Sequence, residues 1–373
     1  MSHKATILML TNSAGGLCHF RFELVERLLS EGYSVFFSVP NNSEDIYVKK
    51  LKEIGAQHIF TKINRRSTNP FIDILLFFKY IKLLKKIKFD IVLTYTIKPN
   101  VYGGIACNIL KIPYIANITG LGSAVENKSI LQNISLFLYK IAFKKVKHVF
   151  FQNSENQEFF FKNNIAIHNN YLLPGSGVNL KKFDILDYPI ESECIKFLFI
   201  SRVMREKGID YYLEAAKYLK SKNPNFEFHI CGACDDSYQN IIKASTKDGI
   251  IIYHGRVPNV RDYLKFTHCT IHPTYYPEGM SNVLLESAAS ARPAITTNRS
   301  GCREIIKDGV NGYIAEQKNS RNLIEKIEKF IGLSYEEKKQ MGLNGRKMVE
   351  DKFDRNIVID AYMKTIKNIL SGN

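Results

Sequence analysis

Residues 272–286 read HPTYYPEGMSNVLLE, which is the pattern of a short strand, a turn and the beginning of a helix. The turn lies at Pro277-Glu278-Gly279, and the helix-like run covers residues 282–286. A helix start presents free backbone N–H groups and positive dipole charge, which favour a bound diphosphate. Glu278 and Glu286 lie eight residues apart, and ionised carboxylates accept hydrogen bonds from sugar hydroxyls. The stretch therefore has two interpretations, a nucleotide-sugar site or a loop and helix with two surface glutamates.

On both sides of this stretch, short apolar strands alternate with amphipathic helices. The pattern predicts strands at 7–10, 35–39, 59–60, 91–94, 114–118, 149–151, 197–200, 226–230, 250–253, 269–272 and 294–296. It predicts helices at 20–30, 45–54, 71–86, 103–110, 131–144, 155–162, 211–221, 238–246, 260–265, 283–290 and 323–331. Such alternation is typical of parallel βαβ units with both sheet faces covered. We predict an α/β protein of two Rossmann-like, doubly wound domains, with ligands at the carboxyl ends of the strands.

The length of 373 residues supports this division, because it exceeds what one core of ordinary size requires. We expect an N-terminal domain at 1–182 and a second domain at 183–352, with a charged linker at 183–194. Residues 353–373 are expected to form a C-terminal helix that packs back on the N-terminal domain.

Composition indicates a globular protein of a reducing compartment. Hydrophobic residues make up 45% of the chain and charged residues 24%, which excludes a disordered chain. The seven cysteines are scattered and accompany no secretory signal, which favours the cytoplasm. No run of about 18 apolar residues occurs, so the sequence predicts no membrane span.

The net charge of +16 is unevenly distributed. Residues 1–185 contain 24 Lys and Arg against 12 Asp and Glu, whereas residues 186–373 contain 28 against 24. A basic half suggests an anionic partner, although lysine-rich composition alone is an alternative. Residues 71–88 and 131–148 are both apolar and basic. Each is either a crossover helix packed on the sheet or a helix that also lies on anionic lipid.

The loop after the first strand contains the glycine pair Gly15-Gly16. Glycines between a strand and a helix let backbone N–H groups approach a phosphate or a sugar. His19 follows this loop and is a candidate site residue. The chain contains neither G-x-G-x-x-G nor a P-loop signature, which argues against a dinucleotide oxidoreductase and a P-loop kinase.

In the second half, Arg202 and Lys207 follow the predicted strand 197–200. A guanidinium and an ammonium at a strand's carboxyl end are suited to hold a diphosphate. Arg256 and Val257 follow a glycine after strand 250–253, where the backbone can hold a base. The C-x-x-C pair at 231–234 is interpreted as a small-residue turn, because no second ligand pair at metal spacing accompanies it. Asp235-Asp236 lacks the spacing of an Asp-x-Asp motif, so a metal-bound nucleotide is not indicated.

Taken together, these motifs resemble the GT-B-fold retaining glycosyltransferases of family four, over nearly the whole chain. The resemblance lies in the 12–24 loop and helix, the stretches 150–153 and 174–179, the 201–208 loop and the E-x7-E motif from Glu278 to Glu286. It implies two domains that face each other across a cleft, the first binding an acceptor and the second a nucleotide sugar.

The resemblance also implies the reaction and the residues that carry it out. A sugar would leave its nucleotide diphosphate with retained anomeric configuration, without a metal or cofactor. Arg202 and Lys207 would neutralise the diphosphate, Glu278 would bind the donor sugar and Glu286 would bind the ribose. The expected catalytic residues are Arg202, Lys207 and Glu278. The expected substrate-binding residues are Gly15, Gly16, His19, Thr119, Gly120, Arg256, Val257, Gly279, Met280, Ser281, Asn282 and Glu286.

One position departs from the family pattern. Many relatives carry His-Gly after the strand that corresponds to residues 114–118, whereas this chain reads Thr119-Gly120-Leu121-Gly122. This variant is similar to a subgroup of bacterial surface-polysaccharide and oligosaccharide transferases. It argues against a base from the enzyme and favours front-face displacement, in which the leaving phosphate takes the acceptor proton.

The leading hypothesis is a cytoplasmic enzyme, peripheral on the inner face of the cell membrane. It would transfer a hexose or N-acetylhexosamine from a UDP-sugar to a polyprenyl-diphosphate-linked glycan for surface polysaccharide, lipopolysaccharide or capsule. The alternatives within enzymes are a GT-B-like sugar-nucleotide epimerase and a transferase with a soluble acceptor. A nucleic-acid-binding protein would need exposed aromatics interleaved with Arg, whereas the aromatics here lie mostly in apolar runs.

Overall fold

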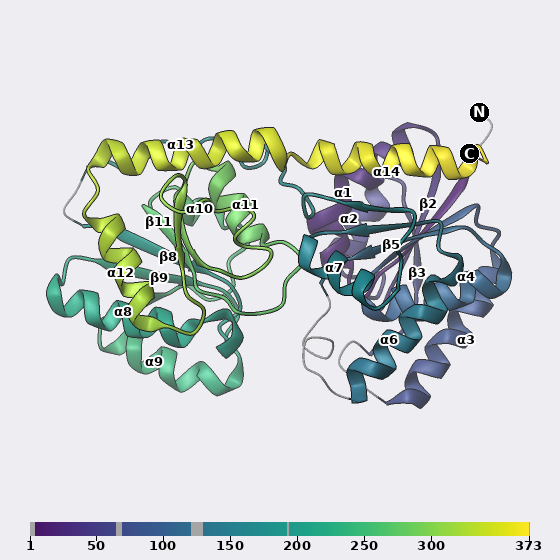
Figure 1. The fold of residues 1–373 in the computed structure, drawn as a ribbon, viewed down its shortest axis with the longest axis horizontal. Coiled ribbons are helices and arrows are strands. Elements are labelled where there is room, and N and C mark those ends of the chain that lie inside the picture. Colours follow the sequence, from purple (N-terminus) through teal and green to yellow (C-terminus); the bar gives the residue numbers. More distant parts are fainter. Residues whose placement is uncertain (1–3, 65–68, 121–129, 192–193, 373) are drawn as a thin grey trace. The chain divides into compact units, whose positions relative to one another are not determined.

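The computed structural model describes residues 4–64, 69–120, 130–191 and 194–372 (Figure 1). The chain divides into a first unit, Met1–Ser176 with Glu278–Met280 and Asn356–Asn373, and a second unit, Gly177–Pro277 with Ser281–Arg355. The divisions fall at 176 and 355, whereas the sequence placed them at 182 and 352. Within the second unit Val178 forms an isolated parallel bridge with Asp354, since the Val178 N–H donates to the Phe353 carbonyl at 2.8 Å.

The first unit contains a seven-stranded parallel sheet with the strand order β3-β2-β1-β4-β5-β6-β7. The strands are β1 (Thr6–Leu10), β2 (Ser34–Val39), β3 (Gln57–Phe60), β4 (Ile91–Tyr95), β5 (Tyr114–Ile118), β6 (His148–Phe151) and β7 (Asn170–Leu172). The sequence pattern did not predict β7. This edge strand has three residues, and Tyr171 and Leu172 are exposed, so it lacks the apolar run of a buried strand.

The helices of the first unit are α1 (Ala14–Ser30), α2 (Ile46–Glu53), α3 (Pro70–Lys86), α4 (Gly104–Leu110), α6 (Ile130–Ala142), α7 (Ser154–Lys162) and α14 (Arg355–Leu370). Helices α1, α2, α3 and α7 begin at side-chain caps. The Asn69 side chain accepts from the Phe71 N–H, and Pro70 occupies the first turn, where its missing N–H has no cost. A π-helical turn, Pro99–Gly103, precedes α4.

Each face of this sheet has its own hydrophobic core. Because side chains alternate along a strand, Ile7 and Met9 belong to one core while Leu8 and Leu10 belong to the other. Helix α14 packs into the first of these cores, through Val358, Ile359, Tyr362, Met363 and Ile366. The Asn117 side chain at the end of β5 also donates to the Tyr362 hydroxyl at 2.6 Å.

The second unit contains a six-stranded parallel sheet with the order β10-β9-β8-β11-β12-β13. The strands are β8 (Lys196–Ile200), β9 (Glu227–Cys231), β10 (Ile252–Tyr253), β11 (Cys269–His272), β12 (Ala294–Thr297) and β13 (Gly312–Ala315). The helices are α8 (Ile209–Lys222), α9 (Gln239–Lys247), α10 (Arg261–Leu264), α11 (Asn282–Ala289), α12 (Ser320–Ile331) and α13 (Tyr335–Lys352). Both sheets are parallel and doubly wound, so the predicted α/β class is confirmed.

The strand order of the second sheet reverses between β8 and β11. In open α/β sheets such a switch point opens a crevice at the carboxyl ends of the strands, and ligands bind there. The loops that follow β8 and β11 are Ser201–Lys207 and Pro273–Ser281. The first sheet reverses between β1 and β4. Several predicted site residues therefore lie in the loops where a ligand of such a sheet would bind.

Candidate functional site

The loops after β8 and β11 interlock in the second unit. Gly208 has φ +78°, and a Cβ there would lie 2.1 Å from the Pro273 carbonyl oxygen. The Tyr275 N–H donates to the Glu206 carbonyl at 3.0 Å. Only glycine fits this approach, because it tolerates positive φ and has no side chain. The contact fixes the short helical turn Arg205–Lys207 beside residues 273–276.

The ammonium of Lys207 occupies a partly desolvated position in this loop. Burial, which disfavours the charged form, lowers the pKa of Lys207 to about 8; the Cys302 thiol raises it slightly and the charge of Arg202 lowers it further. Its Nζ lies 4.8 Å from the centroid of the Tyr276 ring. Arg202, by contrast, is exposed. A cation that is poorly solvated by water gains more from an arriving anion, so the pair is suited to a diphosphate.

Helix α11 begins at the same switch point. Ser281 is an expected substrate-binding residue, but its N–H donates to the Gly301 carbonyl at 2.8 Å and is therefore engaged within the protein. The Ser281 hydroxyl is buried and forms no hydrogen bond within the described residues. Asn282 is the first residue of α11, where helix N–H groups have no intrahelical acceptor. The hydroxyl and the helix N-terminus offer hydrogen-bond donors and positive dipole charge, which are suited to an anion.

Glu286 lies in the second turn of α11 and is half-buried. Burial raises the pKa of Glu286 to about 7, and the charges of Lys182 and Arg355 act in the opposite direction. The carboxyl group is thus partly ionised near neutral pH, and its ionised form accepts hydrogen bonds from hydroxyls. The contact of Glu286 with ribose stays a prediction.

Glu278, Gly279 and Met280 are grouped with the first unit. The Asn153 amide donates to the carbonyls of Glu278 at 3.0 Å and Gly279 at 2.6 Å. A Cβ on Gly279 would lie 2.5 Å from the Thr119 carbonyl oxygen and 2.6 Å from Gln152 Oε1. The structure thus brings together Glu278–Gly279 and the predicted Thr119. The requirement for glycine at 279 arises from this close approach.

Gly120 and Met280 adjoin Thr119 and Gly279, and they contribute in different ways, Gly120 through its backbone conformation and Met280 through packing. Gly120 has φ +135°, a conformation that favours glycine. Met280 is buried, and a Cβ on Gly175 would lie 2.5 Å from the Met280 Cβ. The predicted residue Met280 therefore packs against the 174–179 stretch. Leu121 and Gly122 of the Thr-Gly-Leu-Gly motif lie outside the described residues.

The glycine loop differs from the prediction. Gly15 and Gly16 lie in the first turn of α1, and the Gly16 N–H donates to the Ser13 hydroxyl at 3.2 Å. The N–H is therefore engaged in the helix cap, in contrast to the predicted ligand contact. A Cβ on Gly15 would lie 3.3 Å from the Tyr47 ring. His19 is exposed, and its Nε2 lies 3.3 Å from the Tyr47 hydroxyl.

Arg256 and Val257 follow β10 at the same edge of the second sheet. Arg256 is exposed, whereas Val257 packs against a small core that contains Leu198 and Ile200. The Gly232 N–H donates to the Gly255 carbonyl at 2.8 Å, and a Cβ on Gly232 would lie 1.7 Å from the Ser201 carbonyl oxygen. The C-x-x-C turn thus places the loops after β8, β9 and β10 together. No group of three or more His, Cys, Asp or Glu within the described residues could hold a metal ion.

Two further residues lie at this edge, and of these the sequence interpretation did not single out Arg299. Arg299 follows β12, its Nε donates to the Tyr276 carbonyl at 3.3 Å, and burial lowers its pKa. His272 ends β11, and both of its ring nitrogens are buried without a hydrogen-bond partner in the part of the chain that is described. Burial, with the charge of Lys207, lowers the pKa of His272 to about 3, so the ring is neutral. Their positions at strand ends were visible in the sequence, but the order of the strands was not.

Two family models match the chain. Residues 6–153 match glycosyl transferase 4-like, and residues 181–348 match glycosyl transferases group 1. Together they cover most of the chain and contain the switch-point loops of both sheets. The chain therefore belongs to the glycosyltransferases with the GT-B fold, and the predicted resemblance is confirmed.

Individual relatives agree with this assignment. The chain is 29% identical to the N,N'-diacetylbacillosaminyl-diphospho-undecaprenol alpha-1,3-N-acetylgalactosaminyltransferase of Campylobacter jejuni, over 97% of this chain and 98% of that protein. It is 26% identical to the capsular polysaccharide biosynthesis glycosyltransferase CapM of Staphylococcus aureus, over 83% and 85%. The solved glycosyltransferase from Rickettsia africae superimposes with a TM-score of 0.79 at 21% identity, over 99% and 100% of the chains. Anabaena HepE in complex with UDP and glucose gives a TM-score of 0.79 at 16% identity, over 97% and 99%.

Proposed function

We propose that this protein transfers a hexose or N-acetylhexosamine from a UDP-sugar to a polyprenyl-diphosphate-linked glycan during synthesis of a surface polysaccharide. The observation that carries the proposal is the partly desolvated Lys207 beside Arg202 at the switch point of the second sheet. The acceptor class is supported by the relatives, since the Campylobacter protein is named as a transferase to a diphospho-undecaprenol substrate.

In this proposal, the cations of the second unit stabilise the leaving group. When the bond between the anomeric carbon and the phosphate oxygen breaks, negative charge develops on the UDP diphosphate. Arg202, Lys207 and the N-terminus of α11 are in place before the reaction, so they need little reorganisation to stabilise that charge. Arg299 is a third cation at this edge. These groups supply the charge that a metal ion provides in other transferases, so we propose a reaction without metal or cofactor.

We further propose that the anomeric configuration is retained by front-face displacement. The acceptor hydroxyl attacks the anomeric carbon on the side from which the diphosphate leaves, and its proton passes to a departing phosphate oxygen. Thr119 stands where many relatives carry histidine, and its hydroxyl is a poor base at neutral pH. Glu278 would bind the donor sugar's hydroxyls and stabilise the positive charge at its anomeric carbon.

The donor assignment is tested by measuring UDP release from a panel of UDP-sugars and GDP-sugars, with and without a polyprenyl-diphosphate-linked acceptor. We expect one UDP-sugar to be consumed with acceptor, and Glu278→Ala to abolish turnover while the thermal unfolding curve is unchanged. Near-normal turnover of this variant would contradict the site. An epimerase would convert a UDP-sugar without acceptor, which product analysis would show.

Helices α3 and α6 present an exposed apolar face, which we propose lies on an anionic membrane surface. Phe71 is 75% exposed and Ile130 80% exposed. The other exposed apolar residues of these helices are Ile72, Ile74, Leu75, Phe78, Leu131, Ile134, Phe137 and Ile141. A helix that only covers a sheet would have a polar outer face. No helix of the described residues is long and apolar enough to cross a membrane.

Exposed lysines follow the apolar residues on both helices. In α3 they are Lys79, Lys82, Lys85 and Lys86, and in α6 the exposed lysine is Lys140. Apolar side chains that enter the acyl boundary and lysines that meet anionic headgroups are the two parts of interfacial binding. This arrangement supports a peripheral location on the inner face of the cell membrane.

Vesicle flotation tests the membrane contact. We expect binding to vesicles that contain anionic phospholipid, weaker binding after Lys82, Lys85 and Lys86 are changed to Glu, and weaker binding after Phe71→Ser with Phe78→Ser. Ile241→Ser is the matched control, because Ile241 is an exposed apolar residue of the second unit. Flotation that is equal for all variants would contradict the proposal.

A further inference from the structure

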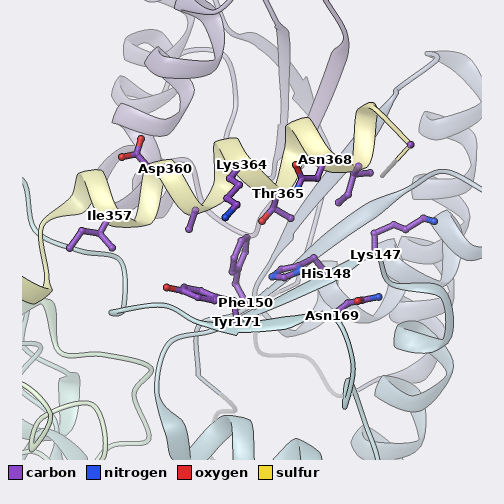
Figure 2. A pocket seen from close by; sticks show the side chains of 13 residues that line it. Lys147, His148, Phe150, Asn169, Tyr171, Ile357, Asp360, Lys364, Thr365 and Asn368 are labelled. Atoms are coloured by element: carbon purple, nitrogen blue, oxygen red, sulfur yellow. The ribbon is translucent and has the colours of Figure 1, made fainter.

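A cavity of about 780 Å³ lies in the first unit between α14 and the strands β6 and β7 (Figure 2). His148 and Phe150 line it from β6 and Tyr171 from β7. His148 is the first residue of β6, whereas Gln152 and Asn153 follow the end of that strand. The cavity therefore reaches the amino ends of the strands, away from the carboxyl edge where substrates of such sheets react.

The strand side of the cavity is an aromatic surface. Phe150 and Tyr171 are paired across β6 and β7, and their ring centroids lie 6.5 Å apart. His148 lies against Phe150, with centroids 4.7 Å apart. Tyr171 is 50% exposed although its neighbour Phe150 is buried. A half-exposed ring next to a cavity offers a flat apolar face to a ligand.

The helix side is mixed. Val358, Tyr362 and Ile366 of α14 point into the core, and the face toward the cavity contains the polar residues Asp360, Lys364, Thr365 and Asn368 beside the apolar Ile357, Ala361 and Ile369. Figure 2 shows Lys364 and Thr365 extending from α14 toward the strands. The polar side chains of this face provide hydrogen-bond donors and acceptors opposite the rings, and its apolar side chains add to the apolar wall.

A pyranose ring has the same two-sided character, with C–H groups on one face and hydroxyls around its rim. Its C–H face fits the Tyr171 ring, and its hydroxyls fit the amide, hydroxyl and ammonium groups of α14. An acyl chain would leave those polar groups without partners. Lys147 and Lys364 are accompanied by Asp360 in the lining, which disfavours a polyanion.

We propose that this cavity binds one sugar unit of a neutral glycan, separately from the site of transfer. The choice of a saccharide rests on the proposed glycosyl transfer. His148 fits a neutral ligand, because burial lowers its pKa to about 4 and leaves the ring uncharged at pH 7. Its buried Nε2 has no hydrogen-bond partner within the described residues. Such a site holds the glycan on the enzyme by a second contact and raises its effective concentration.

Saturation-transfer NMR on the full chain tests the site, with the methyl α-glycosides of galactose and N-acetylgalactosamine as probes. Saturating UDP is present, so that the donor site does not contribute. We expect saturation transfer to the ring protons of at least one glycoside. Tyr171→Ala should weaken that binding at least ten-fold and Asn368→Ala several-fold, while Tyr218→Ala, an exposed tyrosine of the second unit, should not change it.

Absence of glycoside binding would overturn the proposal, as would binding that neither cavity variant weakens, or displacement of the glycoside by uridine. Because Tyr171 and Asn368 are exposed, both variants should keep the melting temperature of the wild type. Glycoside binding that depends on Tyr171, in a protein that consumes no nucleotide sugar, would support the cavity and reject the transferase proposal. Transfer activity without glycoside binding would support the transferase proposal and reject the cavity as a glycan site.

Discussion

The carboxyl edges of the two sheets have the same topology and different chemistry. In the first unit, this edge presents amides and hydroxyls, among them Asn117, Thr119 and Gln152. In the second unit, it presents Arg202, Lys207 and Arg299. The net charge of the two halves of the sequence has the opposite distribution, with the larger positive charge in the first half. Residues 1–185 contain 24 basic against 12 acidic residues, and residues 186–373 contain 28 against 24. The net charge of a unit therefore does not predict the charge at the carboxyl edge of its sheet, and the proposed diphosphate site rests on individual cations such as the partly desolvated Lys207.

The largest expected effect comes from removing the central cation of the second edge. Lys207→Met should lower kcat by about 10³-fold, because the cation acts on charge that develops in the transition state. Thr119→Val, at the edge of the first unit, should lower it less than about ten-fold, since a neutral hydroxyl stabilises little charge. Steady-state rates of the two variants provide the test. Equal losses of kcat in the two variants would contradict a larger electrostatic contribution from the edge of the second unit.

A second expected effect is on stability. Gly208→Ala should lower the free energy of unfolding by about 3 kcal/mol, because it adds a steric clash to a strained backbone. Gly249→Ala is the matched control, since Gly249 has φ +69° with nothing within 4 Å of an added Cβ. Gly249→Ala should lower the free energy of unfolding by only about 1 kcal/mol, because alanine disfavours the left-handed backbone conformation. Urea unfolding measures both, and equal losses would mean that the contact with Pro273 does not restrict position 208.

Glu286→Gln should raise KM for the nucleotide sugar about ten-fold with a smaller change in kcat, since it weakens hydrogen bonds to a charged acceptor in the bound state. Glu316→Gln, on an exposed residue of the same unit, should leave KM unchanged. Initial rates over a range of donor concentrations give both constants. A loss confined to kcat would assign Glu286 a role other than donor binding.

The smallest expected effect is a few-fold change with pH. The value of kcat/KM should rise as Glu286 ionises near pH 7 and fall as Lys207 loses its proton near pH 8, so its maximum lies between them. Glu286→Gln should remove the rising limb, and Lys207→Arg should move the falling limb to higher pH. Because the folded pKa of Glu286 exceeds its usual 4.5, the contribution of Glu286 to stability should decrease from about pH 4.5 to pH 7. A flat profile in wild type would contradict both assignments.

The sequence was sufficient for the fold class and for most of the loops at the second edge, and insufficient elsewhere for physical reasons. Buried parallel strands are continuous apolar runs, so eleven strands and the central loops could be placed from local pattern. Strand β13 begins at Gly312, where a Cβ would lie 2.0 Å from the Ala294 carbonyl oxygen, and no local signal reports such a long-range approach. Arg299 joins the cations because β12 pairs with β11, which only the sheet order reveals.

Glycines were the least predictable residues of the candidate site. Gly16 and Gly279 were both expected to bind substrate. In the structure, Ser13 caps the N–H of Gly16, and the Thr119 carbonyl approaches position 279. A glycine is required equally by a ligand and by a neighbouring backbone, and the sequence does not distinguish the two.

The contribution of α14 to the first core has a consequence for biosynthesis. Residues 1–176 leave the ribosome long before Tyr362 and its neighbours, which complete their core. All residues of the second unit are synthesised before that helix is finished. Although domains generally fold from the N-terminus during translation, the nascent first unit must wait with an unfilled face on its sheet. The core on the opposite face of this sheet, which contains Leu8 and Leu10 and no residue of α14, can close before the core that α14 completes.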